Sequence, residues 1–172
     1  MKFSVPALAL LLSVTAVGCD SADTASNTTA AAVVLGDDDL VTFRYATSAV
    51  GILRDLAYDD QTFTVLAATN DAFVATSAED GLGVDDILGR PDIQQVLNVH
   101  VIRDQVLMAA DLSNGQQITT EAGATLRVVI DGERVGFDAD GDGQADAFVE
   151  AADLTASNGV VHKVDGVFVA SE

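Results

Sequence analysis

The order of the secondary-structure signals constrains the fold of this chain more than any other feature, because helical patterns fill its first half and strand patterns its second. Residues 37–56 begin with three aspartates and then repeat apolar side chains at roughly helical spacing. Gly51 should divide this stretch into two helices. A short helix should start within 69–76, behind capping residues. At 83–102 one or two short helices are expected, with Pro91 opening the second, before the chain runs into a strand.

Strand signals appear once before these later helices and then dominate the rest of the chain. TFTVLAA, at 62–68, alternates and is β-branched, which predicts a strand. From residue 105 onward the segments are short and β-rich, with DGER as a turn between two of them. These strand segments are 105–112, 116–123, 124–137, 146–157 and 159–170. The chain has no internal repeat, and its 172 residues suit one domain.

The first 18 residues predict an export signal. Lys2 supplies a positive charge, and the uncharged stretch FSVPALALLLSVTAVG that follows is short for a membrane span. The small residues directly before Cys19, in AVGC, resemble a bacterial lipobox, in which the cysteine takes a diacylglyceryl group and the chain is cut in front of it. Ala16 stands where leucine is commoner in that motif. The alternative is an ordinary secretory signal followed by an incidental cysteine.

We therefore expect residues 1–18 to be removed and Cys19 to join the protein to membrane lipid. Cys19 is the only cysteine, so it has no intramolecular disulfide partner. Residues 19–36 are Ser, Thr, Ala and Asp without an apolar period, and we interpret them as a flexible tether with a few residues, such as AAVV, ordered against the domain. Residues 37–172 then form a single domain. The expected location is the cell envelope, with the lipid in the outer membrane, at the cell surface or on the periplasmic face of the inner membrane.

The charge balance is strongly acidic, with 27 Asp and Glu against eight Lys and Arg and a formal net charge of −19. So few cations cannot assemble a basic patch, which excludes nucleic acid as a partner. The hydrophobic fraction of 49% is enough for a core and argues against disorder. Because high salt screens this self-repulsion, we infer a salt-loving or marine bacterium. The alternative is simply an acidic secreted protein.

Several blocks, in the right order, resemble the fasciclin domain family. FTVLAATNDAF is similar to the family's first block, with Leu66 in place of Phe and Ala68 in place of Pro. LNVHVIRDQVLMAADL resembles the segment around the family's Tyr-His pair, with Val99 in place of Tyr. NGQQITTEAGATLRVVIDG resembles its middle strands, and DLTASNGVVHKVDGVFV resembles its C-terminal block. The resemblance runs over about residues 38–170.

This resemblance implies an α+β fold, a wedge-shaped β-sandwich with several short helices packed on one side. It also implies a non-enzymatic adhesion or binding module whose partner is an unknown protein or glycan. In animal members the Tyr-His segment and its neighbourhood are linked to integrin recognition. Because Val99 removes the tyrosine, we do not carry that role over, and Val99 and His100 are kept only as candidates for contact with a partner.

Most residues of these blocks are expected to be structural. Asn158–Gly159 is a turn signal. His100 and His162 should form hydrogen bonds inside the fold rather than bind a ligand, because a lone histidine among apolar neighbours is more often a satisfied core residue. The expected core and capping residues are Val65, Ala67, Phe73, Val161 and Val164, with Thr69 or Asn70 as the helix cap.

The stretch FDADGDGQADAFVE lengthens a hairpin that is usually short in the family, and it predicts a calcium site. Calcium takes six to eight oxygen ligands, and alternating aspartates on a tightly wound loop can converge on one ion. With the first aspartate at position one, glycine falls at the sixth position, where the chain must turn sharply. The expected ligands are Asp138, Asp140, Asp142, the backbone carbonyl of Gln144, and Asp146.

The flanks of this loop read as strands, and the twelfth position is Val149 rather than Glu, so a helix–loop–helix EF-hand is not expected. The better likeness is to Asp-rich calcium loops set between two β-strands. Without the ion, four neighbouring carboxylates would repel one another. The alternative is a solvated acidic turn in an Asp-rich protein.

Three functions remain in competition. The first is a lipid-anchored adhesion or binding module, and the second is a calcium-stabilised structural envelope protein without an adhesive role. The third is an enzyme, for which the chain shows no nucleophile elbow, zinc-ligand spacing or phosphate loop. A deep pocket that holds a histidine beside a carboxylate would favour the enzyme.

Overall fold

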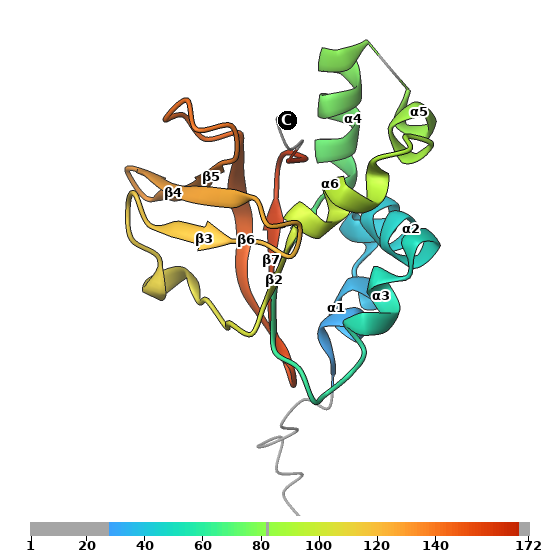
Figure 1. The fold of residues 1–172 in the computed structure, drawn as a ribbon, viewed down its shortest axis with the longest axis horizontal. Coiled ribbons are helices and arrows are strands. Elements are labelled where there is room, and N and C mark those ends of the chain that lie inside the picture. Colours follow the sequence, from blue (N-terminus) through green and yellow to red (C-terminus); the bar gives the residue numbers. More distant parts are fainter. Residues whose placement is uncertain (1–27, 82, 169–172) are drawn as a thin grey trace, which may run out of the picture.

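A computed structural model describes residues 28–81 and 83–168 of the chain. Helices and strands both form, with the helices concentrated before residue 100 (Figure 1). Among the described residues, no helix has the length and apolar character needed to cross a membrane. The helices are α1 (Ala30–Gly36), α2 (Val41–Val50), α3 (Ile52–Asp55), α4 (Asn70–Asp80), α5 (Val84–Leu88) and α6 (Ile93–Val99), with 3₁₀ turns η1 (Asp38–Leu40) and η2 (Ala109–Asp111).

Seven strands form one hydrogen-bonded sheet in the order β2-β1-β7-β6-β5-β4-β3. β1 and β7 pair in parallel, and every other neighbouring pair is antiparallel. The long strand β6 pairs with β7 on one side and with β5 on the other, so it joins the two halves of the sheet. The strands are β1 (Phe63–Ala68), β2 (Val101–Arg103), β3 (Gln117–Thr119), β4 (Thr125–Asp131), β5 (Arg134–Asp138), β6 (Ala147–Ala156) and β7 (Gly159–Val164).

The α-helices lie together beside β1, β2 and β7, while β3, β4 and β5 extend away from them (Figure 1). The fold is therefore α+β with several short helices packed on one side, as the sequence predicts. Every residue of β1 is buried, because the strand is covered on both faces. Its neighbour β7 is mostly buried as well, and Val161 and Val164 belong to the core as expected.

Local sequence explains where the first helices begin and end. Gly51 adopts a left-handed conformation with φ of 89°, which ends α2 and starts α3 as predicted. Thr69 caps α4, since its hydroxyl accepts a hydrogen bond from the amide of Ala72 at 3.2 Å. Asn70 does not cap this helix but joins it to another, because its side-chain oxygen accepts from the amide of Thr42. Pro91 precedes α6 by two residues instead of opening it.

Asn158 is a buried clamp rather than a simple turn residue. Its side-chain oxygen accepts from the amide of Ala30 at 2.7 Å, and its side-chain nitrogen donates to the carbonyls of Leu56 and Tyr58 at 2.9 Å each. Its own carbonyl accepts from the amide of Phe63 at 2.9 Å. The side chain of Asn158 thus fixes the start of α1 and the end of the α3 region, and its backbone carbonyl fixes the entry to β1.

Gly159 makes this clamp sterically feasible. A Cβ at position 159 would collide with the carbonyl oxygen of Phe63, so the parallel strands β1 and β7 approach too closely there for any other residue. The dipeptide Asn158–Gly159 therefore sets the register of the pair, with Gly159 opposite Phe63.

The domain begins earlier than the expected boundary at residue 37. Residues 30–36 form helix α1, and Ala30, Ala31 and Val34 are buried in the core. Helix α1 includes the AAVV segment, residues 31–34, which was expected to be ordered against the domain, and it extends that order to residues 30, 35 and 36. The cause is tertiary, because the amide of Ala31 also bonds to the carbonyl of Leu56 at 3.2 Å. Residues 19–27 lie outside the described residues.

The aspartates after α1 are held by the only lysine that follows the export signal. The ammonium of Lys163, on β7, lies 2.9 Å from Asp37 and 2.8 Å from Asp39. Burial alone would raise the pKa of Asp37, but the hydrogen bond and charge of Lys163, together with the hydrogen bond from the amide of Asp39, leave this pKa below its ordinary value. These ion pairs tie the first helical turns to the central strand β7.

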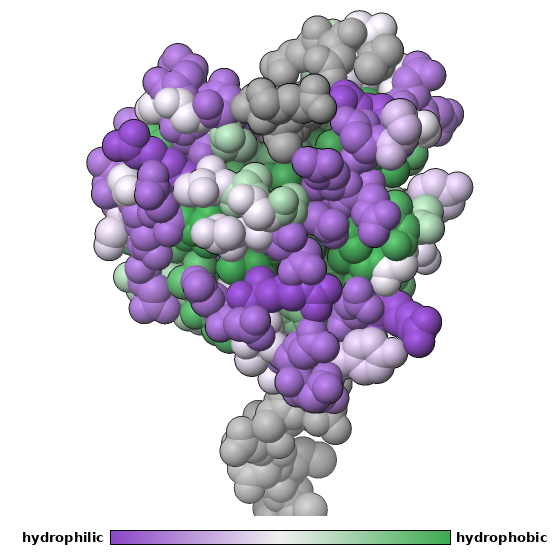
Figure 2. All heavy atoms as spheres, in the orientation of Figure 1, coloured by the Kyte–Doolittle hydropathy of each residue, from purple (hydrophilic) through white to green (hydrophobic). Residues whose placement is uncertain are grey.

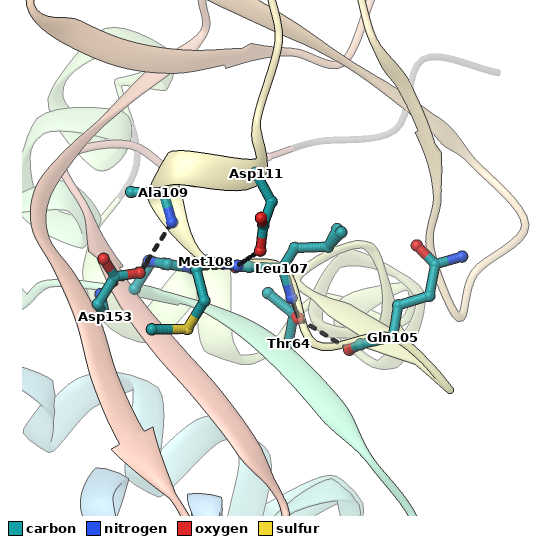
Figure 3. Close-up of polar contacts among 8 residues, drawn as sticks. Thr64, Gln105, Leu107, Met108, Ala109, Asp111 and Asp153 are labelled. Atoms are coloured by element: carbon teal, nitrogen blue, oxygen red, sulfur yellow. Dashed lines mark hydrogen bonds and ion pairs between the residues drawn. The ribbon is translucent and has the colours of Figure 1, made fainter.

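Residues 105–112 do not form the expected strand. Asp104 takes a left-handed conformation with φ of 60°, which turns the chain away after β2. Figure 3 shows how the segment is then held by side chains: Thr64 donates to the carbonyl of Gln105 and accepts from the amide of Leu107, both at 2.9 Å. Asp153 accepts from the amide of Ala109 at 2.8 Å. Because these donors bond to side chains, they are unavailable for a strand ladder.

We expect Asn158→Ala to lower the free energy of unfolding by roughly 2–4 kcal/mol, since it leaves buried backbone groups without partners. Asn114→Ala is the matched control: its side chain accepts a single exposed hydrogen bond from Ile130, and its loss should cost less than about 1 kcal/mol. Urea unfolding of the chain from residue 20 onward measures both. Equal, small effects would show that Asn158 is not a clamp.

Candidate functional site: an acidic loop between two strands

The predicted calcium loop connects the antiparallel strands β5 and β6, as the strand-like flanks indicated. The last register pair before the loop is Phe137 opposite Ala147. The amide of Asp146 also donates to the carbonyl of Phe137 at 2.9 Å. Residues 139–146 are thus closed at their base by backbone bonds, which brings the first and last acidic residues of the loop together.

Asp138 organises the loop from inside. Its side chain is buried, and its two oxygens accept from the amides of Gly141 at 2.6 Å and Gly143 at 2.9 Å. These glycines have φ of 83° and 91°, a conformation that other residues adopt only with strain. Gly143, at the sixth loop position, therefore makes the sharp turn that the sequence predicts.

Three of the four aspartates converge. Asp138, Asp140 and Asp146 each offer a carboxylate oxygen, and these oxygens lie within 4.8 Å of one another. Asp146 is held in place because its Oδ2 accepts from the amide of Ala139 at 2.6 Å. A donor set made only of oxygens, closely spaced and anionic, fits Ca²⁺ better than the softer transition metals. The three carboxylates could therefore hold a metal ion.

Asp142, another expected ligand, does not join this trio. Asp142 accepts from the backbone amide of Gln144 at 2.7 Å and from its side-chain amide at 3.1 Å. This pair lies on the exposed outer part of the loop. Asp140 contributes to the turn as well, since it accepts from the amide of Asp142 at 2.9 Å.

The electrostatics of the loop reflect crowded negative charge. Burial raises the pKa of Asp146 above its ordinary value, and the neighbouring carboxylates of Asp140 and Asp138 raise it further. The hydrogen bond from Ala139 acts in the opposite direction without cancelling these effects. A cation bound here would remove the repulsion.

His100 is a structural residue of the core. Its Nδ1 lies 2.8 Å from the carbonyl of Val96, and its Nε2 accepts from the amide of Phe168 at 3.3 Å, which assigns the proton to Nδ1. Complete burial lowers the pKa of His100 to about 4, so the ring stays neutral down to acidic pH. Val99 is fully buried too, and neither candidate for partner contact presents its side chain at the surface.

His162 forms hydrogen bonds inside the fold, as expected, and these bonds fasten the segment 105–109 to the sheet. Its Nδ1 accepts from the amide of Asp153 at 3.1 Å, and its Nε2 donates to the carbonyl of Leu107 at 2.8 Å. Asp153 lies in an irregular part of β6 with φ of 60°. The only local signal for this arrangement was the histidine itself, because its partners come from two distant segments.

The histidine–carboxylate pocket that would favour an enzyme is not formed by the cavities described for this chain. The Nδ1 of His162 lies 3.9 Å from the Oδ1 of Asp153, but the ring is buried and both its nitrogens are already bonded. Two cavities on the described surface are lined mainly by residues of α3, α6 and β2 and of the segment after β3, and neither histidine is among them.

One solved structure and one family model identify the fold and the family of this chain. A FAS1 domain pair from the insect cell adhesion molecule Fasciclin I superimposes with a TM-score of 0.67 at 15% identity, over 83% of this chain and 51% of that one. At this identity the likeness establishes the mixed α+β fold. The family model described as Fasciclin domain matches residues 38–170. The chain therefore belongs to the fasciclin domain family.

Curated relatives agree with this assignment. Transforming growth factor-beta-induced protein ig-h3 from Sus scrofa is 29% identical over 134 residues, which are 77% of this chain but 18% of that protein. The chain thus spans about a fifth of the length of this relative. Protein sll1483 from Synechocystis is 30% identical over 152 residues, which cover 86% of this chain and 77% of the relative.

We expect Asp146→Asn to stabilise the calcium-free protein at neutral pH, by roughly 1–3 °C in Tm. A raised folded-state pKa means that the ionised carboxylate costs stability above the unfolded pKa of 3.8, and this cost vanishes as pH falls below that value. The Tm values of variant and parent should therefore converge near pH 3.5. Thermal unfolding from pH 3.5 to 7.5 measures this. A variant that is less stable at pH 7 would contradict the repulsion.

Proposed function

We propose that this protein is a lipid-anchored, non-enzymatic binding or adhesion module of the bacterial cell envelope. The observation that carries the proposal is membership of the fasciclin domain family, which includes a domain pair from an insect cell adhesion molecule. The buried histidines support a non-catalytic role, because the bonds of their ring nitrogens are used to hold the fold together. The partner is a protein or a glycan.

The anchor is the lipid on Cys19. This residue lies outside the described residues, so the proposal rests on the sequence AVGC at the end of the apolar export signal. Helix α1 begins at Ala30, so about ten residues separate the lipid from the folded domain. An extended chain of that length reaches on the order of 35 Å, enough to hold the domain clear of lipid headgroups.

We expect Cys19→Ser to move the protein from the membrane fraction to the soluble fraction, since serine cannot take a thioether-linked lipid. Labelling with a radioactive or alkynyl fatty acid should disappear at the same time. Ser21→Ala is the control and should stay lipid-labelled. A Cys19→Ser variant that still carries the label would contradict the anchor.

We further propose that the β5–β6 loop binds one calcium ion through Asp138, Asp140 and Asp146. Convergence of their oxygens within 4.8 Å supports this assignment. The ion would also draw on oxygens of the outer loop, where Asp142 and the carbonyl of Gln144 are the expected ligands. Binding would neutralise the repulsion around Asp146 and stiffen the hairpin.

We expect one saturable calcium site in calorimetric titrations, in moderate and in high sodium chloride, with the chain from residue 20 onward. Retaining α1 matters, because a chain cut at residue 36 would lose buried side chains. Asp140→Asn should weaken binding at least tenfold, because it removes one charged ligand without touching a buried group. Asp60→Asn, an exposed aspartate outside the loop, is the control.

Weak heat that does not saturate, fades with salt and persists in Asp140→Asn would show a solvated acidic turn instead. The second candidate function, a calcium-stabilised structural protein without an adhesive role, shares the calcium site. It is favoured by the position of that site on a hairpin that extends the sheet. The two candidate functions differ in one respect. With calcium bound, only the adhesion module binds a partner surface.

A further inference from the structure

Two adjoining cavities form a groove along helix α6 that the calcium loop does not share. One has a volume of about 310 Å³ and the other about 460 Å³. Gln94, Asn98 and Glu121 line both, so the two cavities adjoin. Their sizes lie in the lower part of the range of about 300–1,000 Å³ that ligand sites occupy. Figure 2 shows a largely hydrophilic surface over α6 that meets a hydrophobic patch over α2.

The smaller cavity is balanced in charge, although the protein as a whole is strongly anionic. Its ionisable lining consists of Arg54 and Arg103 against Asp55 and Glu121. The Nε of Arg103 lies 2.6 Å from the carboxylate of Glu121, at an angle that makes an ion pair but not a hydrogen bond. Its Nη2 lies 3.5 Å from the carboxylate of Asp55. Arg103 thus forms an ion pair with each of the two carboxylates.

The side chain of Arg103 is itself held in place by contacts with Phe63 and Gln61. Its guanidinium carbon lies 5.4 Å from the centre of the Phe63 ring, and its Nη1 donates to the side chain of Gln61 at 2.7 Å. The groove therefore has a rigid polar floor before any ligand arrives. Pre-organised groups of this kind raise affinity because binding does not have to order them.

The groove also offers hydrogen-bonding groups that are neutral and free. Within the described part of the chain, the side-chain amides of Gln94 and Asn98 make no hydrogen bond, and each offers both a donor and an acceptor. Val50, Ile52 and Val101 supply an apolar wall beside them. Donors, acceptors and an apolar wall at close quarters match a molecule that carries hydroxyl groups around a C–H face.

We propose that this groove binds a neutral saccharide. A net charge of −19 disfavours an anionic ligand. A cationic ligand would compete with Arg103 for carboxylates that are already paired. A neutral polyhydroxyl ring meets neither obstacle: its hydroxyls bond to the two amides and to the outward oxygens of Asp55 and Glu121, and its C–H face packs against the valines. The inference rests on the proposed binding function and names the partner class.

The test uses the full-length protein in a detergent without a sugar headgroup. Binding to a panel of neutral oligosaccharides is measured by saturation-transfer NMR and by calorimetry. We expect at least one to bind, and Asn98→Ala to weaken it about tenfold through the lost hydrogen bonds. Asn114→Ala, an amide on the opposite part of the sheet, should change nothing. The proposed saccharide site would be overturned if Asn98→Ala bound as tightly as the parent protein, or if no member of the panel bound.

A second readout separates this inference from the proposed function. Beads that carry the full-length protein are tested for adhesion to surfaces coated with matrix proteins or with neutral polysaccharides. Adhesion to polysaccharide that free oligosaccharide abolishes supports both proposals. Adhesion to matrix proteins alone would overturn the saccharide groove and leave the binding function standing, and adhesion to neither surface would overturn both.

Discussion

The buried side chain of Asn158 is the interaction on which the rest of the structure depends. It joins the amide of Ala30 to the carbonyls of Leu56 and Tyr58, and its own carbonyl receives the first amide of β1. Gly159 then lets β7 approach β1 closely enough to pair in parallel. The start of α1, the end of the α3 region and the neighbouring strands β1 and β7 are thereby held together. A polar group this deeply buried is favourable only because all its hydrogen bonds are made.

This frame leaves the functional surfaces at its margins. The acidic loop hangs from the far half of the sheet, where β5 and β6 share only two register pairs. The groove lies on the helical side, where Arg103 at the edge strand β2 meets α3 and α6. Neither surface uses the core histidines. His100 joins the end of α6 to the C-terminal segment, and His162 fastens residues 105–109 to the sheet. Binding can therefore change at either margin without repacking the core.

Local patterns predicted the elements whose bonds are local. Gly51, Thr69 and the β5–β6 hairpin all follow from turn, capping or alternation signals, and the structure confirms them. The extent of α1 and the irregular course of residues 105–112 were not predicted, because both segments obtain their partners from distant residues. The acidic loop was placed correctly, but spacing alone did not show that Asp142 faces Gln144 rather than the trio. The groove left no local signal, since four separate segments line it.

The central claim is that the bonds around Asn158 form a fixed frame, while the acidic loop at its margin can change. Amide hydrogen exchange with and without calcium tests this claim most directly. The account predicts that the amides of Ala30 and Phe63 exchange only through global unfolding, with a free energy equal to that of unfolding by urea. Calcium should slow the amides of Gly141 and Gly143, and outside the loop it should slow exchange only where exchange requires global unfolding. Rapid local exchange at Ala30, or calcium protection that is absent from the loop, would contradict the account.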